Sequence, residues 1–197
     1  MLDTHARKYV QPVIGHTARL LLKWGLTPNQ VTWIAFVIGV SVGYWIYADL
    51  PIIAVAVLWF SGFLDAVDGS MARLKKQTSP WGTLLDITFD RLVELSVIIG
   101  LAVKYPDAQL LLLLLTASIV FSMTIFLTVG ALTEKKGMKS FYYQAGVAER
   151  TEGFLLFTLM ILLPGLLLWS TGLFLVVETF TGLQRMLEAR RILREPD

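Results

Sequence analysis

Long apolar runs, separated by short polar segments, dominate the chain. The runs at 31–47, 110–127 and 154–169 approach or reach the length of a helix that crosses a hydrocarbon layer of about 30 Å. Prolines, glycines and charged residues divide the apolar sequence into helical segments at about 27–48, 51–74, 80–104, 107–133, 147–163 and 168–193. We therefore expect an all-α integral membrane protein with six transmembrane helices.

The segment before the first run has a different pattern. In residues 3–24, apolar residues such as Val13 and Leu20 alternate at helical spacing with basic residues such as Arg19 and Lys23. A basic amphipathic helix before a first span is typical of one that lies in the membrane interface, although a solvated basic leader has the same composition. We predict an interfacial helix over 1–26, kinked at Pro12, and a single six-helix domain over 27–197.

Two proline-containing segments predict where helices begin. In Thr27-Pro28-Asn29-Gln30, the threonine is placed to cap a helix, the proline suits the first helical position, and Gln30 completes a capping box. Ser79-Pro80 has the same cap-plus-proline order.

The composition agrees with a membrane protein. Of 197 residues, 55% are hydrophobic, and the mean hydropathy is +0.65, which is too apolar for a soluble domain of this size. The absence of cysteine excludes disulfides and thiolate metal sites, and a net charge of +2 gives no indication of nucleic-acid binding.

The distribution of basic residues predicts an orientation. With six spans, every Lys and Arg except Lys104 falls on the side that holds both termini. Positive charge favours the cytoplasmic side, so we expect a multi-pass protein of the cell membrane with residues 75–79 in the cytoplasm.

Four aspartates interrupt the apolar pattern between residues 65 and 90. A carboxylate in hydrocarbon costs several kcal/mol or more, which makes a functional role the default interpretation. Asp65 and Asp68 are three residues apart, and Asp86 and Asp90 are four apart, so each pair shares a helix face. The short connection at 75–79 makes the two helices antiparallel neighbours whose aspartates can converge at the cytoplasmic end.

The chemistry of such a cluster favours hard cations. Four carboxylates repel one another unless cations neutralise them, and oxygen-only ligation indicates Mg²⁺ or Mn²⁺, with Ca²⁺ as a competitor. Two ions could clamp a pyrophosphate and its leaving group. Gly69 and Gly82 would let a nucleotide approach the backbone, and Arg73 suits a phosphate. Each taken alone, the glycines would indicate helix packing, and Arg73 would indicate the basic cytoplasmic end of a membrane span.

The spacing as a whole resembles the signature of the CDP-alcohol phosphotransferase (phosphatidyltransferase) family, D-x2-D-G-x2-A-R-x8-G-x3-D-x3-D. All eight fixed positions are filled, by Asp65, Asp68, Gly69, Ala72, Arg73, Gly82, Asp86 and Asp90. The resemblance implies a six-helix membrane protein, usually a homodimer, that displaces CMP from a CDP-linked donor with an alcohol.

The resemblance also implies roles for these residues. Asp65, Asp68 and Asp86 would hold metal, and Asp90 would be the catalytic base, a metal ligand or both. The CDP moiety would be held by Asp68, Gly69, Ala72, Arg73 and Gly82. The short chain resembles the branch of the family that uses CDP-diacylglycerol.

Two further segments resemble the prokaryotic inositol-phosphate phospholipid synthases of this family. They are G-V-A-E-R-T-E at 146–152 and T-G-L-Q-R at 181–185, in which Arg150 and Arg185 would hold the phosphate of the acceptor. The chain departs from those enzymes at 130–134, where two expected basic residues are missing. Lys135, Lys136 and Lys139 lie close by and either compensate or form a solvated loop. The acceptor stays open among inositol phosphate, glycerol phosphate, serine and other polar alcohols.

We therefore predict a metal-dependent membrane phospholipid synthase that transfers the phosphatidyl group of CDP-diacylglycerol to a polar alcohol and releases CMP. One alternative is a transferase that moves the phospho-alcohol group of a CDP-linked alcohol to diacylglycerol and releases CMP. An alternative of another class is a divalent-cation transporter, which would place its acids near the membrane midplane between inverted repeats. Here the acids lie at one end of their helices, and no repeat is visible.

Overall fold

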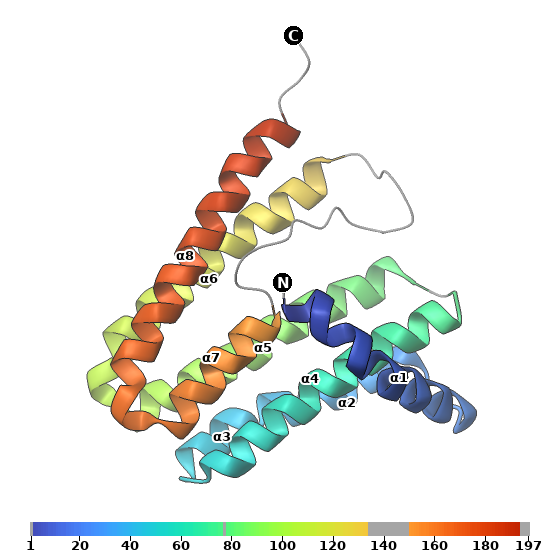
Figure 1. Cartoon of the computed structure of the whole chain (residues 1–197), viewed down its shortest axis with the longest axis horizontal. Coiled ribbons are helices and arrows are strands. Elements are labelled where there is room, and N and C mark those ends of the chain that lie inside the picture. Colours follow the sequence, from blue (N-terminus) through green and yellow to red (C-terminus); the bar gives the residue numbers. More distant parts are fainter. Residues whose placement is uncertain (1, 77, 134–149, 194–197) are drawn as a thin grey trace. The chain divides into compact units, whose positions relative to one another are not determined.

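The computed structural model describes residues 2–76, 78–133 and 150–193, with side chains from Val10 onward, and this part of the chain is helical without strands (Figure 1). The α-helices, with two short 3-10 turns, are α1 (Leu2–Lys23), α2 (Pro28–Val40), α3 (Val42–Tyr47), α4 (Pro51–Leu74), α5 (Pro80–Lys104), η1 (Pro106–Ala108), α6 (Gln109–Leu132), α7 (Arg150–Leu162), η2 (Pro164–Leu166) and α8 (Leu167–Ile192).

Four segments of the described chain are long and apolar enough to cross a membrane. They are Pro28–Tyr47, Pro51–Leu74, Pro106–Leu132 and Pro164–Ile192. The first half of α5 carries several charged side chains, and α7 has 13 residues, so neither meets the same standard. The all-helical, multi-pass class is confirmed, while the count of six spans and the interfacial position of α1 stay predictions.

The predicted helix starts are confirmed. The Thr27 backbone N–H donates to Gln30 Oε1 at 2.9 Å, and the Gln30 N–H donates to Thr27 Oγ1 at 3.3 Å, which completes the capping box. At the start of α5, the Gly82 N–H donates to Ser79 Oγ at 3.0 Å. These contacts satisfy amide groups that the first turn of a helix leaves without partners, and so fix where each helix begins. Both starts lie beside the pocket described below.

The first apolar run differs from the single helix predicted over 27–48. Its helix is interrupted at Ser41, between α2 and α3. Hydrogen bonds from Ser96 of α5 stabilise the interruption. The Ser96 hydroxyl donates to Val40 O at 2.6 Å and accepts from the Gly43 N–H at 3.1 Å. A side chain at Gly43 would collide with the Ser96 carbonyl oxygen, so only glycine permits this approach.

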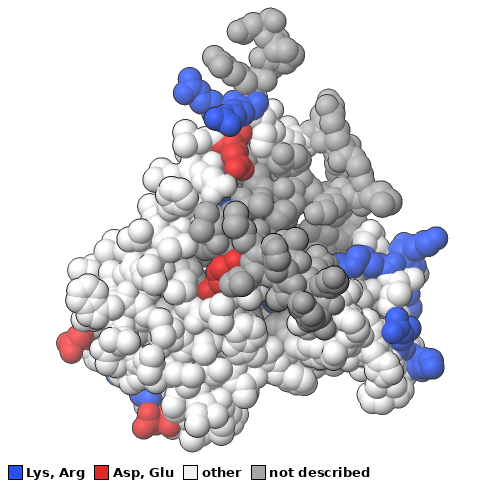
Figure 2. Space-filling model, in the orientation of Figure 1, with Lys and Arg blue, Asp and Glu red and all other residues white. Residues whose placement is uncertain are grey.

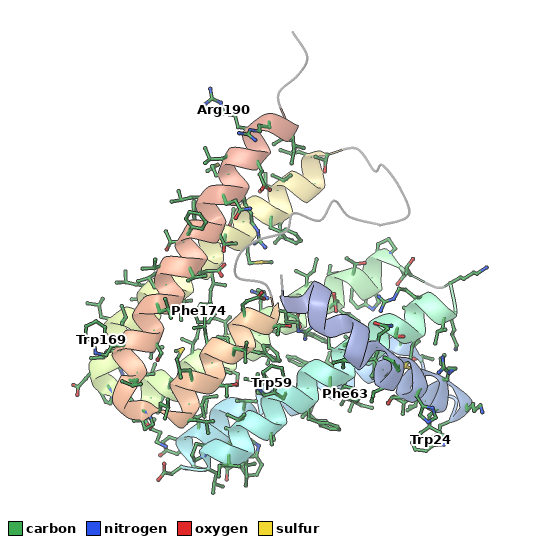
Figure 3. The ribbon with its side chains drawn as sticks, in the orientation of Figure 1. Trp24, Trp59, Phe63, Trp169, Phe174 and Arg190 are labelled. Carbon is green, nitrogen blue, oxygen red and sulfur yellow. The ribbon has the colours of Figure 1, made fainter. Side chains whose placement is uncertain are left out.

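The helices form two compact units, and the first comprises α1–α5. In it, α2 packs against both α4 and α5, while α1 packs against α4. Its core joins α1, α2 and α4 through Ile14, Ala18, Val31, Ala35, Leu64, Val67 and Met71. Pro12 lies inside α1, which continues as one helix from Leu2 to Lys23, and Trp24 is exposed at its end (Figure 3).

The second unit comprises α6–α8, with α8 packed against both α6 and α7. Phe157 of α7 and Phe174 of α8 meet edge to face with ring centroids 5.1 Å apart, and Figure 3 labels Phe174 on α8. At Gly182, a side chain would overlap the Phe121 ring of α6, so this glycine permits the close crossing of α6 and α8.

The visible surface suits a lipid environment. Figure 2 shows that most of the described surface on the drawn face is uncharged and that the larger groups of lysine and arginine side chains lie at its margins. Large apolar side chains such as Ile52, Trp169 and Val176 are exposed along the helices, as expected where lipid rather than water surrounds them.

Candidate functional site

Three of the four aspartates converge. Asp65 and Asp68 lie toward the end of α4, and Asp86 lies near the start of α5. One carboxylate oxygen from each lies within 4.8 Å of the others, which forms a group of possible metal ligands among the described residues. Asp68 is buried, with 5% of its surface exposed.

This donor set fits a divalent cation. Three carboxylates at such distances repel one another, and the repulsion is severe where water is excluded. An ion bound among them would remove that repulsion, and purely carboxylate ligation is the chemistry preferred by Mg²⁺, Mn²⁺ and Ca²⁺. The geometry therefore supports a metal role for Asp65, Asp68 and Asp86.

A pocket of roughly 380 Å³ adjoins two of these carboxylates. Such a volume falls within the range of small-molecule sites, roughly 300–1,000 Å³. It lies between the start of α2, the end of α4 and the start of α5. Its lining consists of Thr27, Pro28, Asn29, Thr32, Asp68, Gly69, Ala72, Arg73, Thr78, Ser79, Gly82, Thr83 and Asp86.

All five residues predicted to hold the donor line this pocket: Asp68, Gly69, Ala72, Arg73 and Gly82. The guanidinium of Arg73 folds back over Gly69, where a Cβ would lie 3.4 Å from Arg73 Nη1. At Gly82, a Cβ would lie 3.5 Å from Asn29 Oδ1. Glycine at each position therefore leaves the backbone open beside a polar side chain of the pocket.

The pocket also contains polar residues that the sequence interpretation missed. Asn29 and Thr32 project from α2, and Thr78 and Thr83 flank the start of α5. The available signal was their position: Asn29 and Thr32 are three residues apart, which places two polar groups on one face of an otherwise apolar helix. The sequence pattern alone assigns Asn29 to a helix start.

Asp90 occupies a different position from the other three acids. It lies one turn beyond Asp86 on α5, and the described group of mutually close carboxylates does not include it. The neighbouring Arg91 pairs with Glu94 at 2.6 Å on the same helix. The proposed roles of Asp90, as base and as metal ligand, stay predictions.

The predicted acceptor residues lie in the second unit. Arg150 begins α7, with its guanidinium carbon 5.6 Å from the centre of the Phe154 ring. Arg185 is buried between α8 and α6: its Nη1 donates to Ser122 Oγ at 2.9 Å, and its guanidinium carbon lies 5.1 Å from the centre of the Phe126 ring. Lys135 lies outside the described residues. The acceptor role of all three stays a prediction.

Comparison with known proteins extends beyond the aspartate motif. The model of the family described as CDP-alcohol phosphatidyltransferase matches residues 25–184. The inner membrane protein YnjF of Escherichia coli is 33% identical over 83% of this chain and 83% of its own. Archaetidylinositol phosphate synthase of Pyrococcus horikoshii is 40% identical over 52% of this chain, a match that spans 54% of that protein.

Solved structures show the same fold. The phosphatidylinositol phosphate synthase of Mycobacterium tuberculosis with CDP-DAG bound superposes with a TM-score of 0.78 and 22% identity, over 94% of this chain and 99% of that one. The same enzyme in complex with manganese and citrate gives a TM-score of 0.76 at 22% identity, over 93% of each chain.

Proposed function

The chain belongs to the CDP-alcohol phosphatidyltransferase family, and from this premise we propose that it transfers the phosphatidyl group of CDP-diacylglycerol to a hydroxyl of a polar alcohol. The observation that carries the proposal is the convergence of Asp65, Asp68 and Asp86 beside a pocket that contains every predicted donor residue. The choice of donor is supported by a relative whose name specifies it, the CDP-diacylglycerol–inositol 3-phosphatidyltransferase of Rattus norvegicus, which is 32% identical over 43% of this chain.

In this proposal, the pocket binds the CDP moiety. Gly69 and Gly82 provide the open backbone, and Arg73 offers a planar cation that suits a phosphate oxygen pair. Asn29, Thr32 and Thr83 supply amide and hydroxyl groups for the polar edges of the nucleotide. A divalent cation held by Asp65, Asp68 and Asp86, when bound, would neutralise the diphosphate and stabilise charge on the leaving CMP. Mg²⁺ or Mn²⁺ fits this ligation, and Asp90 is the proposed further ligand for a second ion.

The proposed transfer is a displacement at phosphorus. The acceptor hydroxyl oxygen bonds to the phosphorus that carries the diacylglycerol, and the bond from that phosphorus to the oxygen bridging to CMP breaks. CMP leaves with the bridging oxygen, and the hydroxyl proton passes to Asp90. A carboxylate is suited to this task because the alcohol must lose its proton as it attacks.

For the acceptor, we propose a polar alcohol that Arg150 and Arg185 help to hold, with Lys135 as a further candidate. Both arginines match the resemblance to inositol-phosphate enzymes, and Arg185 presents a buried cation fixed by Ser122 and Phe126. The missing basic residues at 130–134 leave fewer positive charges than those enzymes have. The acceptors to be compared are therefore inositol phosphate, glycerol phosphate, serine and other polar alcohols.

We further propose that the enzyme is a homodimer of the cell membrane with six spans, α1 in the interface, and a pocket open to the cytoplasm. The support for this orientation is the basic composition of the segments beside the pocket, including Lys75 and Lys76. No nucleic-acid partner is expected.

The decisive experiment incubates purified protein with CDP-diacylglycerol, Mg²⁺ and a panel of labelled acceptors, and resolves the product lipids. We expect CMP release that depends on one acceptor and stops with a chelator. Full activity in chelator would contradict the metal site. A product formed from CDP-choline or CDP-ethanolamine and diacylglycerol, with none from CDP-diacylglycerol, would favour the alternative transferase.

A further inference from the structure

The helices that carry the three carboxylates are held apart rather than packed together. Along their described lengths, α4 and α5 make little contact with each other, whereas α2 packs closely on both. The short helix α3 also packs on both, but it is α2 that lines the pocket beside Asp68 and Asp86, so the distance between these two residues depends on how α4 and α5 each pack on α2. This arrangement matters because three like charges within 4.8 Å would separate if their helices were free to move.

One contact that holds α4 against α2 lies one helical turn from Asp65. Ser61, four residues before Asp65, is 3% exposed, and its hydroxyl donates to Ala35 O of α2 at 2.8 Å. A serine hydroxyl in a helix usually bonds within its own helix, as Ser118 does with Leu115 O at 2.7 Å. The bond from Ser61 instead ties α4 to α2.

The contact that holds α5 against α2 lies equally close to Asp86. Phe89, three residues after Asp86, stacks on Phe36 of α2 with ring centroids 4.1 Å apart and planes 19° apart. Trp33 of α2 meets the same ring edge to face at 4.6 Å. Both helices are therefore fixed to α2 within about one turn of the carboxylates that they carry.

Gly39 is the point where these three helices meet. A Cβ at this position would lie 2.5 Å from Val93 Cγ2 of α5 and would also overlap Ser61 Oγ of α4. Because Val93 is stiff at its branched Cβ and Ser61 is held by its hydrogen bond, a side chain at Gly39 would push both helices away from α2. We propose that Gly39 is a positioning residue, which sets the separation of α4 and α5 and so the geometry of the carboxylate group.

This inference rests on the proposed metal site, and a Mn²⁺ titration tests the two separately. The signal of free Mn²⁺ in electron paramagnetic resonance, measured with purified protein in detergent, reports affinity without turnover. Wild type should bind Mn²⁺ and Asp68→Asn should not; a wild type that bound no Mn²⁺ would overturn both the metal site and the role of Gly39.

With binding by wild type established, Gly39→Ala should weaken Mn²⁺ affinity at least about tenfold, the lower range for changes in residues that orient metal ligands. The matched control is Gly100→Ala, whose Cβ would lie 2.7 Å from the Gly43 backbone at the crossing of α3 and α5. That crossing is about 20 Å farther along α5 than Asp86. Gly100→Ala should therefore lower thermal stability and leave Mn²⁺ affinity within about twofold of wild type.

A rescue variant checks the steric cause. Val93→Ala combined with Gly39→Ala makes room for the added methyl group, and we expect affinity to return to within about threefold of wild type. Wild-type affinity in folded Gly39→Ala, or equal weakening by Gly39→Ala and Gly100→Ala, would overturn the proposal.

If Gly39→Ala fails to fold, the seat of α4 provides a second test. Ser61→Ala removes the bond to α2 one turn from Asp65, and Ser118→Ala removes a buried serine bond that stays within α6. Weaker Mn²⁺ binding in Ser61→Ala alone would support the positioning role of this crossing, and unchanged binding in both would overturn it.

Discussion

Among the three converging acids, Asp68 is both buried and part of the pocket lining. Asp68→Asn keeps the shape of the side chain and removes one charge from a crowded group. We expect CMP release to fall to background, while the thermal midpoint of the metal-free protein stays equal or rises as repulsion is relieved. Loss of activity through unfolding would instead lower that midpoint.

Asp90 tests the assignment of the base. Asp90→Asn leaves Asp65, Asp68 and Asp86 in place, so Mn²⁺ and CDP-diacylglycerol should still bind. Turnover should be at least ~100-fold slower, because the acceptor hydroxyl would lose its proton acceptor. Binding and single-turnover measurements separate these effects. Metal binding that weakened in proportion to the rate would identify Asp90 as a ligand and leave the base unassigned.

Arg185 tests the acceptor subsite. If the acceptor carries a phosphate, Arg185→Ala and Arg150→Ala should each raise the KM for acceptor about tenfold or more, because each removes a charge-assisted contact. The KM for CDP-diacylglycerol should change little, since the pocket proposed to bind this donor is lined from α2, α4 and α5. Comparable losses toward donor and acceptor would show that the two subsites are wrongly divided.

Residues of the site differ in how readily the sequence reveals them. The sequence predicts the aspartates, Gly69, Arg73 and Gly82, because charged residues in a membrane helix are costly and usually have a function. Asn29 and Thr32 were not assigned because short polar side chains occur at many helix starts, and only folding brings them beside Asp68 and Gly82.

Among the elements, the starts of α2 and α5 were predictable from local signals, and α4 occupies the predicted range. The interruption at Ser41 was not, because it depends on the Ser96 hydroxyl, which approaches from a helix far along the chain. The packing of α4 and α5 on α2 was not predictable either, since a short connection predicts neighbouring helices but says nothing of a third helix on which both pack.

The cap of α2 gives a prediction at this scale. Thr27→Ala removes the acceptor for the Gln30 N–H and should lower the free energy of unfolding by about 1 kcal/mol, the usual cost of losing such a cap. Thr124→Ala is the matched control, because the Thr124 hydroxyl bonds to Val120 O within its own helix. Thermal unfolding in detergent compares the two variants, and equal losses would assign the cap no special role.

The molecule as a whole has a predicted sidedness that labelling can test. The chain has no cysteine, so a single introduced thiol reports one position. In sealed cells, Gln77→Cys should resist an impermeant thiol reagent until the membrane is opened. Leu50→Cys and Leu166→Cys, which replace exposed residues at helix ends, should react from outside. Reaction of the thiol at position 77 in intact cells would reverse the topology.

The proposed donor pocket is built from one continuous stretch of chain, between Thr27 and Asp86, whereas the proposed acceptor arginines come from α7 and α8. During synthesis, the pocket-forming stretch leaves the ribosome before α6 is made, and chains generally fold from the N-terminal part first. The part proposed to bind the donor is thus synthesised before the part proposed to hold the acceptor alcohol. If this division is right, exchanging the later helices between relatives should change the acceptor that is used and leave the donor unchanged.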